Sequence, residues 1–72
     1  MKKLHPGDMV KIYGEGMQYL RDKDNWKNGY KIPFQKTDVG MVLEYDTESM
    51  CYKVMIPAGI GWIIDMHVEG LE

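Results

Sequence analysis

The side chains that could carry out chemistry are few and scattered along the chain. His5, His67 and Cys51 are its only histidines and its only cysteine. They are not grouped in the short paired spacings that zinc sites use, so we expect no metal site. No glycine-rich loop of the kind that cradles a phosphate ahead of a helix is present either, so we expect no cofactor.

Three acidic residues, Glu44, Asp46 and Glu48, come closest to a catalytic group. They lie close together around one short polar stretch, with no neighbouring segment that would form a cleft. We interpret them as a solvated turn. A chain of 72 residues builds only one small core and leaves no interior for a substrate. The sequence therefore argues against an enzyme.

The aromatic residues are better candidates, and they suit binding. Trp26 lies between Asn25 and Lys27, where no apolar neighbour accounts for an indole, so we favour a binding role for it. Trp62 is either a recognition residue or a ring that packs over the edge of the core. Five more aromatic residues could form a patch or a cage for a cation, and we expect about two of them to be exposed. These five are Tyr13, Tyr19, Tyr30, Phe34 and Tyr45.

Short strands must position these residues. Residues 9–13 and 51–56 alternate between apolar and other side chains, which indicates half-buried strands. Residues 39–45 contain three consecutive apolar residues, which indicates a strand buried on both faces or interrupted by a β-bulge. Residues 60–64 and 68–71 complete about five strands, and no run is typical of a helix. We expect one core formed by Val10, Ile12, Val54, Ile56, Ile63 and Val68.

Residues 17–36 form the least regular segment. They are either one long loop or a loop that contains a hairpin around Asn28-Gly29, a pair favoured in tight turns. A long structureless loop is uncommon in a small domain unless it has a function. We therefore expect the binding surface in this segment.

The end of the chain resembles the end of SH3-type barrels. That family closes with glycine, a large apolar residue and Ile or Val, followed by one turn of 3₁₀ helix, then Tyr and Val or Leu. Here Gly61-Trp62-Ile63 is followed by Ile64-Asp65-Met66 and then by His67-Val68. Residues 7–12 look like the first strand of that family, and residues 39–45 look like its second, with a bend at Gly40.

This resemblance implies an all-β fold: a five-stranded SH3-like barrel formed by a single domain over residues 1–72. A long loop would follow the first strand, and a 3₁₀ turn would precede the last. The chain is also similar to uncharacterised SH3-fold proteins of tailed bacteriophages, being very short, acidic and rich in Met and Tyr. That likeness implies a phage-encoded protein.

The chain departs from the signalling SH3 domains at the positions that grip proline-rich ligands. His67 stands where those domains have a late tyrosine, and their central pair of tryptophans is missing. We therefore expect no recognition of proline-rich ligands. We see no export signal, so we do not expect the cell-wall binding of bacterial SH3-like domains either.

Charge is unevenly distributed along the chain. Residues 1–36 hold eight Lys or Arg against four Asp or Glu (+4), whereas residues 37–72 hold one against seven (−6). Such asymmetry can orient a partner or a second copy. The single cysteine suits a reducing compartment, and we expect it to be a small buried apolar residue. No apolar run is long enough to span a bilayer, so we expect a soluble protein in the cytoplasm of a host cell, or in a virion.

We expect a non-catalytic protein-interaction module that binds a host or virion protein through the long loop and the adjacent barrel face. The candidate partner-binding residues are Tyr13, Tyr19, Trp26, Tyr30, Trp62 and His67. One alternative is binding of single-stranded nucleic acid through residues 19–36, where basic and aromatic residues interleave. The other is a structural subunit of a larger assembly.

Overall fold

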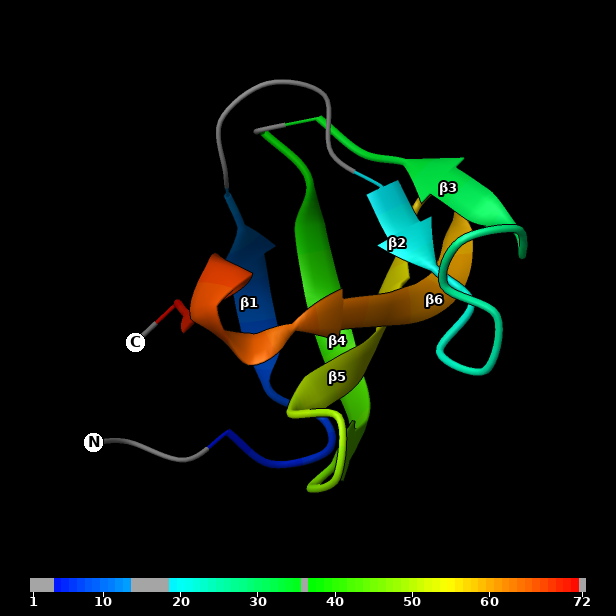
Figure 1. The fold of residues 1–72 in the computed structure, drawn as a ribbon. Coiled ribbons are helices and arrows are strands. Elements are labelled where there is room, and N and C mark those ends of the chain that lie inside the picture. Colours follow the sequence, from blue (N-terminus) through cyan, green and yellow to red (C-terminus); the bar gives the residue numbers. More distant parts are fainter. Residues whose placement is uncertain (1–3, 14–18, 36, 72) are drawn as a thin grey trace.

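The structure, a computed structural model, describes residues 4–13, 19–35 and 37–71. In this part of the chain every element is a strand or a single turn of 3₁₀ helix, so the fold is all-β as expected (Figure 1). The strands are β1 (Met9–Ile12), β2 (Tyr19–Arg21), β3 (Lys31–Pro33), β4 (Val39–Asp46), β5 (Cys51–Ile56), β6 (Gly59–Ile64) and β7 (Val68–Gly70). The 3₁₀ helix η1 (Asp65–His67) joins β6 to β7.

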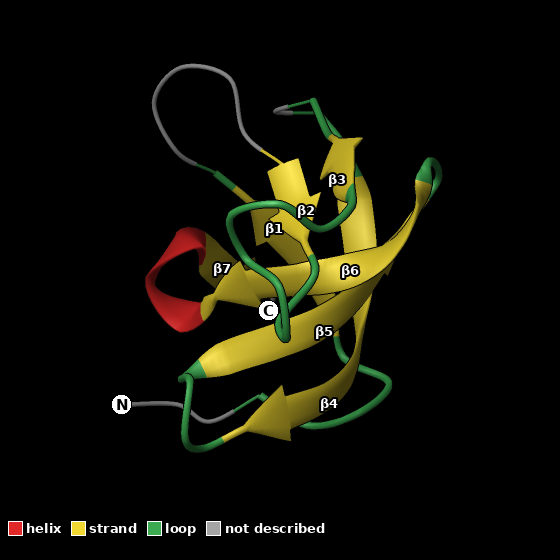
Figure 2. Ribbon diagram, turned by 45° about the vertical axis from the view of Figure 1, so that its right-hand side comes forward, coloured by secondary structure: helices red, strands yellow, loops and turns green. Residues whose placement is uncertain are grey.

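All the strands belong to one antiparallel sheet in the order β3-β2-β6-β5-β4-β1-β7. The sheet is open in its pairing, because β3 and β7 lie at opposite ends of this order. It curves strongly, so that β1 and β7 lie across from β5 and β6 rather than in one plane with them (Figure 2).

The expected core is confirmed. The residues Val10, Ile12, Val54, Ile56, Ile63 and Val68 are all buried in one cluster. Leu4, Leu20, Val42 and Tyr52 complete that cluster. It forms because alternate residues of a strand point to the same face, and the curved sheet brings those faces together. At about 25 cal/mol per Å² of apolar surface, burial of each such side chain contributes about 1.5–3 kcal/mol.

Strand β4 carries the irregularity that its sequence indicates. The register between β4 and β5 shifts between Val42 and Glu44, so Leu43 is the extra residue of a β-bulge. Gly40 lies where β4 crosses the core, and a Cβ atom there would lie 2.6 Å from Cγ1 of Val54. Glycine is thus required at this position for the close approach of β4 and β5.

The seven strands exceed the expected five because the segment after β1 contains a hairpin. Strands β2 and β3 pair antiparallel, with Leu20 opposite Ile32. The hairpin alternative for this segment is therefore confirmed. Asn28-Gly29 does not form a two-residue turn, however, because the whole of residues 22–30 separates the strands.

The 3₁₀ turn before the last strand is also confirmed, one residue later than expected. It spans Asp65–His67, whereas the sequence pattern placed it at residues 64–66. Ile63 and Val68 on either side of it both point into the core. The turn thus reverses the chain between two buried side chains.

Candidate interaction surface

The β2–β3 hairpin and strand β6 meet where Arg21 and Trp62 lie directly opposite each other. Side chains of such a cross-strand pair lie on the same face of the sheet. The guanidinium carbon of Arg21 also lies 5.5 Å from the ring centroid of Trp26. Its Nη1 donates a hydrogen bond to the backbone oxygen of Trp26 at 3.2 Å. Arg21 therefore contacts Trp26 and lies beside Trp62 in the sheet.

Lys23 holds the other tryptophan. Its Nζ lies 4.9 Å from the ring centroid of Trp62, which is within the range of a cation–π contact. The same Nζ lies 3.7 Å from Oδ1 of Asp46, at the end of β4. These two contacts attach the loop between β2 and β3 to β6 and to the end of β4. Figure 2 shows this loop lying in front of β6. We call Arg21, Lys23, Trp26 and Trp62 the tryptophan stack.

Asp46 is held in place for this contact by the turn that follows it. Its Oδ2 accepts hydrogen bonds from the hydroxyl and the backbone N–H of Ser49, at 2.6 and 2.9 Å. The bond from the Ser49 hydroxyl, then the bond from its N–H, and to a smaller extent the charge of Lys23, lower the pKa of Asp46. The carboxylate is therefore ionised at neutral pH and available to Lys23.

The loop of residues 22–30 has a definite conformation of its own. Asp22 accepts hydrogen bonds from the backbone N–H groups of Asp24 and Asn25, and Asn25 accepts others from Asn28 and Gly29. Such local bonds give a loop the order that a binding surface requires. Trp26 therefore projects from a folded loop, with 42% of its surface exposed.

Tyr30 ends this loop and packs against β6. A Cβ atom at Gly61 would lie 3.3 Å from Cε1 of Tyr30 and 2.7 Å from Cβ of Leu20, so the absence of a side chain at Gly61 lets the hairpin approach β6. Partial burial, followed by the charges of Asp22 and Asp24, raises the pKa of Tyr30. Its ring remains 46% exposed.

No family model, no curated protein and no solved structure matches this chain. Among residues 4–13, 19–35 and 37–71, no group of three or more His, Cys, Asp or Glu side chains is placed to hold a metal ion. The same residues contain no helix with the length and apolar character needed to cross a membrane.

The remaining candidate residues are placed elsewhere. The N–H of Tyr13 donates a hydrogen bond to the backbone oxygen of His67 at 3.0 Å, which brings these two residues together beside η1. Tyr19 is half-buried in β2, opposite Pro33. The structure thus brings Trp26, Tyr30 and Trp62 together around β6, and places Tyr13 and His67 at the turn into β7. As expected, two of the five aromatic residues that could form a patch, Tyr13 and Tyr30, are exposed.

Polar and aromatic contacts of Tyr45 support η1. The hydroxyl of Tyr45 donates a hydrogen bond to Oδ2 of Asp65 at 3.0 Å, and the rings of Tyr45 and Tyr52 lie 4.6 Å apart. Burial, then the bond to Asp65, raises the pKa of Tyr45. Cys51 next to them is buried, as expected. We assign these residues to the stability of the turn.

Three residues of this surface, Arg21, Lys23 and Asp46, were not among the predicted binding residues. Arg21 and Lys23 were considered only as part of a basic segment, and Asp46 only as part of a solvated turn. The single sequence signal was the interleaving of cations with aromatic residues. Nothing in it indicated that Lys23 would reach across to Asp46 at the end of β4.

Proposed function

We propose that the chain is a non-catalytic protein-interaction module built on an SH3-like barrel. Strands β7-β1-β4-β5-β6, in that order, correspond to the five strands of the barrel, and the β2–β3 hairpin is an elaboration of the long connection after the first. The 3₁₀ turn before β7 supports this assignment. A rigid sheet that carries an ordered, aromatic loop is a common arrangement for recognition.

The observation that carries the proposal is the tryptophan stack. It pairs each of two indole rings with a cation from the β2–β3 hairpin: Arg21 lies over Trp26 of the hairpin loop, and Lys23 lies over Trp62 of β6. Tryptophan and arginine are the residues most enriched at the energetic centres of protein interfaces. Trp26 is 42% exposed, and the contacts with Arg21 restrict its orientation, so binding costs less further ordering.

Affinity capture from a lysate of the source or host cells tests this proposal. We expect the unmodified chain to retain a defined protein and Trp26→Ala to lose it. Met66→Ala, which changes an exposed side chain in η1, is the matched control and should still capture it. Equal capture by Trp26→Ala would remove the tryptophan stack from the interaction.

Binding of single-stranded nucleic acid has less support. Lys23 is engaged by Asp46, and Asp22 and Asp24 add negative charge to the same loop. Titration of a mixed-sequence oligonucleotide across salt concentrations decides between the two functions, since phosphate contacts are strongest at low salt. Tight binding at low salt that Arg21→Met abolishes would replace the protein-interaction proposal.

A further inference from the structure

Two cations lie directly opposite each other in the β2–β3 hairpin. Arg21 in β2 pairs with Lys31 in β3, the end strand of the sheet, and we call these two residues the cation pair. Residues paired in this way project from the same face, with Cβ atoms about 5 Å apart. That face points away from the core, because the neighbouring residues Leu20 and Ile32 pack into or against the core. Like charges in such positions destabilise a sheet, so the cation pair opposes the fold.

No described acidic side chain neutralises the cation pair. Two other cations beside Trp62 each have a carboxylate within reach. Nζ of Lys23 lies 3.7 Å from Oδ1 of Asp46, and Nζ of Lys53 lies 3.9 Å from Oε2 of Glu44. Within the part of the chain that the structure describes, no carboxylate oxygen lies within 4.0 Å of a charged nitrogen of the cation pair. Unneutralised positive charge is therefore located on the outer face of the hairpin.

The acidic residues of the hairpin loop lie near Tyr30. A Cβ atom at Gly61 would lie 2.7 Å from Cβ of Leu20 and 3.3 Å from Cε1 of Tyr30, so Tyr30 packs on the same side of the hairpin as the buried Leu20. Partial burial, followed by the charges of Asp22 and Asp24, raises the pKa of Tyr30. These two carboxylates therefore act on Tyr30, and neither forms an ion pair with the cation pair.

The guanidinium group of Arg21 is oriented by Trp26. Its central carbon lies 5.5 Å from the centroid of the indole ring, and Nη1 donates a hydrogen bond to the backbone oxygen of Trp26 at 3.2 Å. Arginine carries five N–H donors in a planar fork, and this bond uses one of them. The other donors suit a carboxylate, which arginine binds through two parallel hydrogen bonds.

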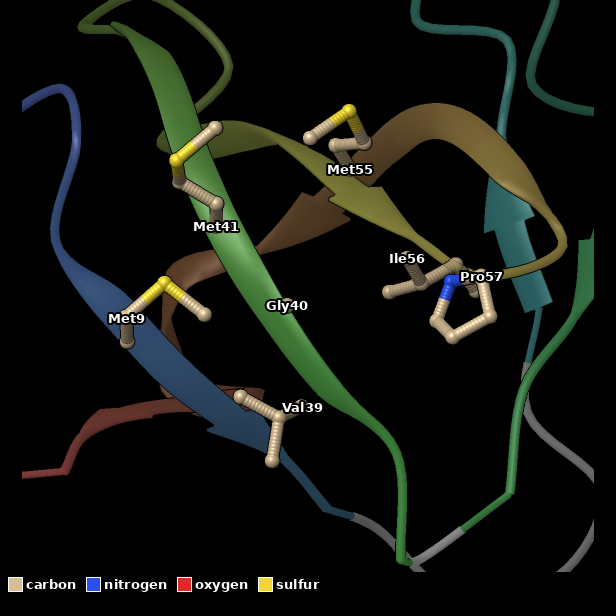
Figure 3. A pocket seen from close by; sticks show the side chains of 7 residues that line it. All are labelled: Met9, Val39, Gly40, Met41, Met55, Ile56 and Pro57. Carbon is tan, nitrogen blue, oxygen red and sulfur yellow. The ribbon is translucent and has the colours of Figure 1, made fainter.

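The hollow on the outer face of the sheet does not offer such a position. Met9, Met41 and Met55 project around Gly40 from three neighbouring strands (Figure 3), and no residue that lines the hollow between them is charged. An anionic group that approaches the outer face is therefore attracted to the hairpin rather than to this hollow.

We propose that the protein partner presents an acidic side chain to the cation pair and, next to it, an apolar side chain to the exposed part of Trp26. This inference rests on the proposed function, because it names the chemistry of the partner that the tryptophan stack binds. The carboxylate of the partner gains charge-assisted hydrogen bonds from Arg21 and relieves the repulsion between Arg21 and Lys31. Lys31 is exposed on an end strand, so a partner reaches it without a change in the fold.

A nucleic-acid strand suits this surface less well than a single acidic side chain does. Its phosphates form a continuous row of negative charge that extends well beyond two cations. Such a row would approach Asp22 and Asp24 in the loop, or Glu44 across the sheet. The compact cation pair therefore favours one carboxylate of a protein.

A library of random short peptides, displayed and selected on the immobilised whole chain, tests the inference without a known partner. We expect the selected peptides to be enriched in Asp or Glu next to a large apolar residue, and Trp26→Ala to lose them. In one such peptide, replacing the acidic residue by its amide should weaken binding about fivefold at low salt. Titration followed by tryptophan fluorescence measures the affinities.

Lys31→Glu separates binding from folding. The variant places a carboxylate opposite Arg21, so we expect it to be at least as stable in urea as the unmodified chain. The same carboxylate occupies Arg21 and repels the partner, so we expect the acidic peptide to bind about tenfold more weakly. Lys11→Glu, an equal change of charge at an exposed position of β1, is the control and should retain the affinity.

The outcomes distinguish the inference from the proposed function. Peptides that require Trp26 but show no excess of acidic residues, or that bind Lys31→Glu undiminished, would overturn the inference alone. A loss of stability in Lys31→Glu would overturn it as well, because Lys31 would then already have a partner within the fold. Tighter binding of a mixed-sequence oligonucleotide, lost in Lys31→Glu, would assign the cation pair to nucleic acid instead. If no selected peptide requires Trp26, the proposed function fails, and the inference fails with it.

Discussion

The ammonium group of Lys23 lies 4.9 Å from the ring centroid of Trp62, although 38 residues separate them in the chain. The contact fastens the loop of residues 22–30 to strand β6. A cation–π contact at a partly exposed site contributes about 0.5–1 kcal/mol. It is therefore strong enough to bias the position of the loop and weak enough for a partner to displace.

Replacing Lys23 by methionine keeps the aliphatic stem and removes the charge. We expect Lys23→Met to lower the free energy of unfolding by about 0.5–1 kcal/mol through the lost cation–π contact. The difference from the unmodified protein should shrink at high salt, because the pairing of Lys23 with Asp46 is screened. Urea denaturation followed by tryptophan fluorescence measures both effects. Lys27→Met, an exposed change in the same loop, is the control and should have little effect.

Asp46 makes the stability of the fold depend on pH in the acidic range. Hydrogen bonds from Ser49 hold the pKa of its carboxyl below the ordinary value of 3.8 in the folded state. The associated stability is therefore fully present above pH 3.8 and is lost as the pH falls through the lower pKa of the folded state. In Asp46→Asn this part of the acid dependence should be missing, which urea denaturation between neutral and strongly acidic pH would reveal. Glu48→Gln, in the same turn, should retain it; identical acid profiles for Asp46→Asn and the unmodified protein would contradict the assignment.

Gly61 sets how closely the β2–β3 hairpin approaches β6. A Cβ atom there would lie 2.7 Å from Cβ of Leu20, whose side chain is fully buried. Because neither atom can yield easily, we expect Gly61→Ala to lower the free energy of unfolding by about 1–3 kcal/mol. It should also shift the amide signals of residues 19–33 more than those of β1 and β7.

Gly70→Ala is the matched control for that change. Its Cβ atom would meet only the end of the Leu4 side chain, at 3.0 Å, which can move. A smaller loss of stability is expected there, without displacement of the hairpin. Equal losses in the two variants would mean that the approach of Leu20 to Gly61 does not limit the fold.

The parts of this structure that could be predicted from the sequence are those that follow from burial. Alternation in residues 9–13 and 51–56 shows which face of each strand is buried, and it predicted four of the six expected core residues, Val10, Ile12, Val54 and Ile56. The consecutive apolar residues of β4 indicated the bulge at Leu43. Strands β2 and β3 have three residues each, too few for a period of two to be visible. Their existence depends on packing against β6, which local sequence does not encode.

The candidate surface was predicted less completely for a related reason. Trp26 stood out because its neighbours are polar, and its exposure in the folded loop agrees with that signal. The position of Lys23 over Trp62 depends on how the loop folds back on the sheet, and no local pattern predicts it. The sequence also did not predict that Met9, Met41, Met55 and Ile60 lie side by side, because they are on four strands that only the register brings together.

Met50 is the one non-glycine residue of the described chain with a positive φ, at 58°. It closes the turn between β4 and β5, and its backbone oxygen accepts a hydrogen bond from the N–H of Asp65 at 2.9 Å, which holds the conformation. A left-handed conformation costs an ordinary residue about 1 kcal/mol, whereas glycine and asparagine adopt it readily. Met50→Gly should therefore raise the free energy of unfolding by about 0.5 kcal/mol, the relief of strain being partly offset by the greater freedom of glycine in the unfolded chain. Thermal and urea denaturation measure the gain. Met50→Asn should give a similar increase, and Met50→Ala, which retains the strain, should give none. Destabilisation by both Gly and Asn would show that contacts of the exposed Met50 side chain outweigh the strain in its backbone.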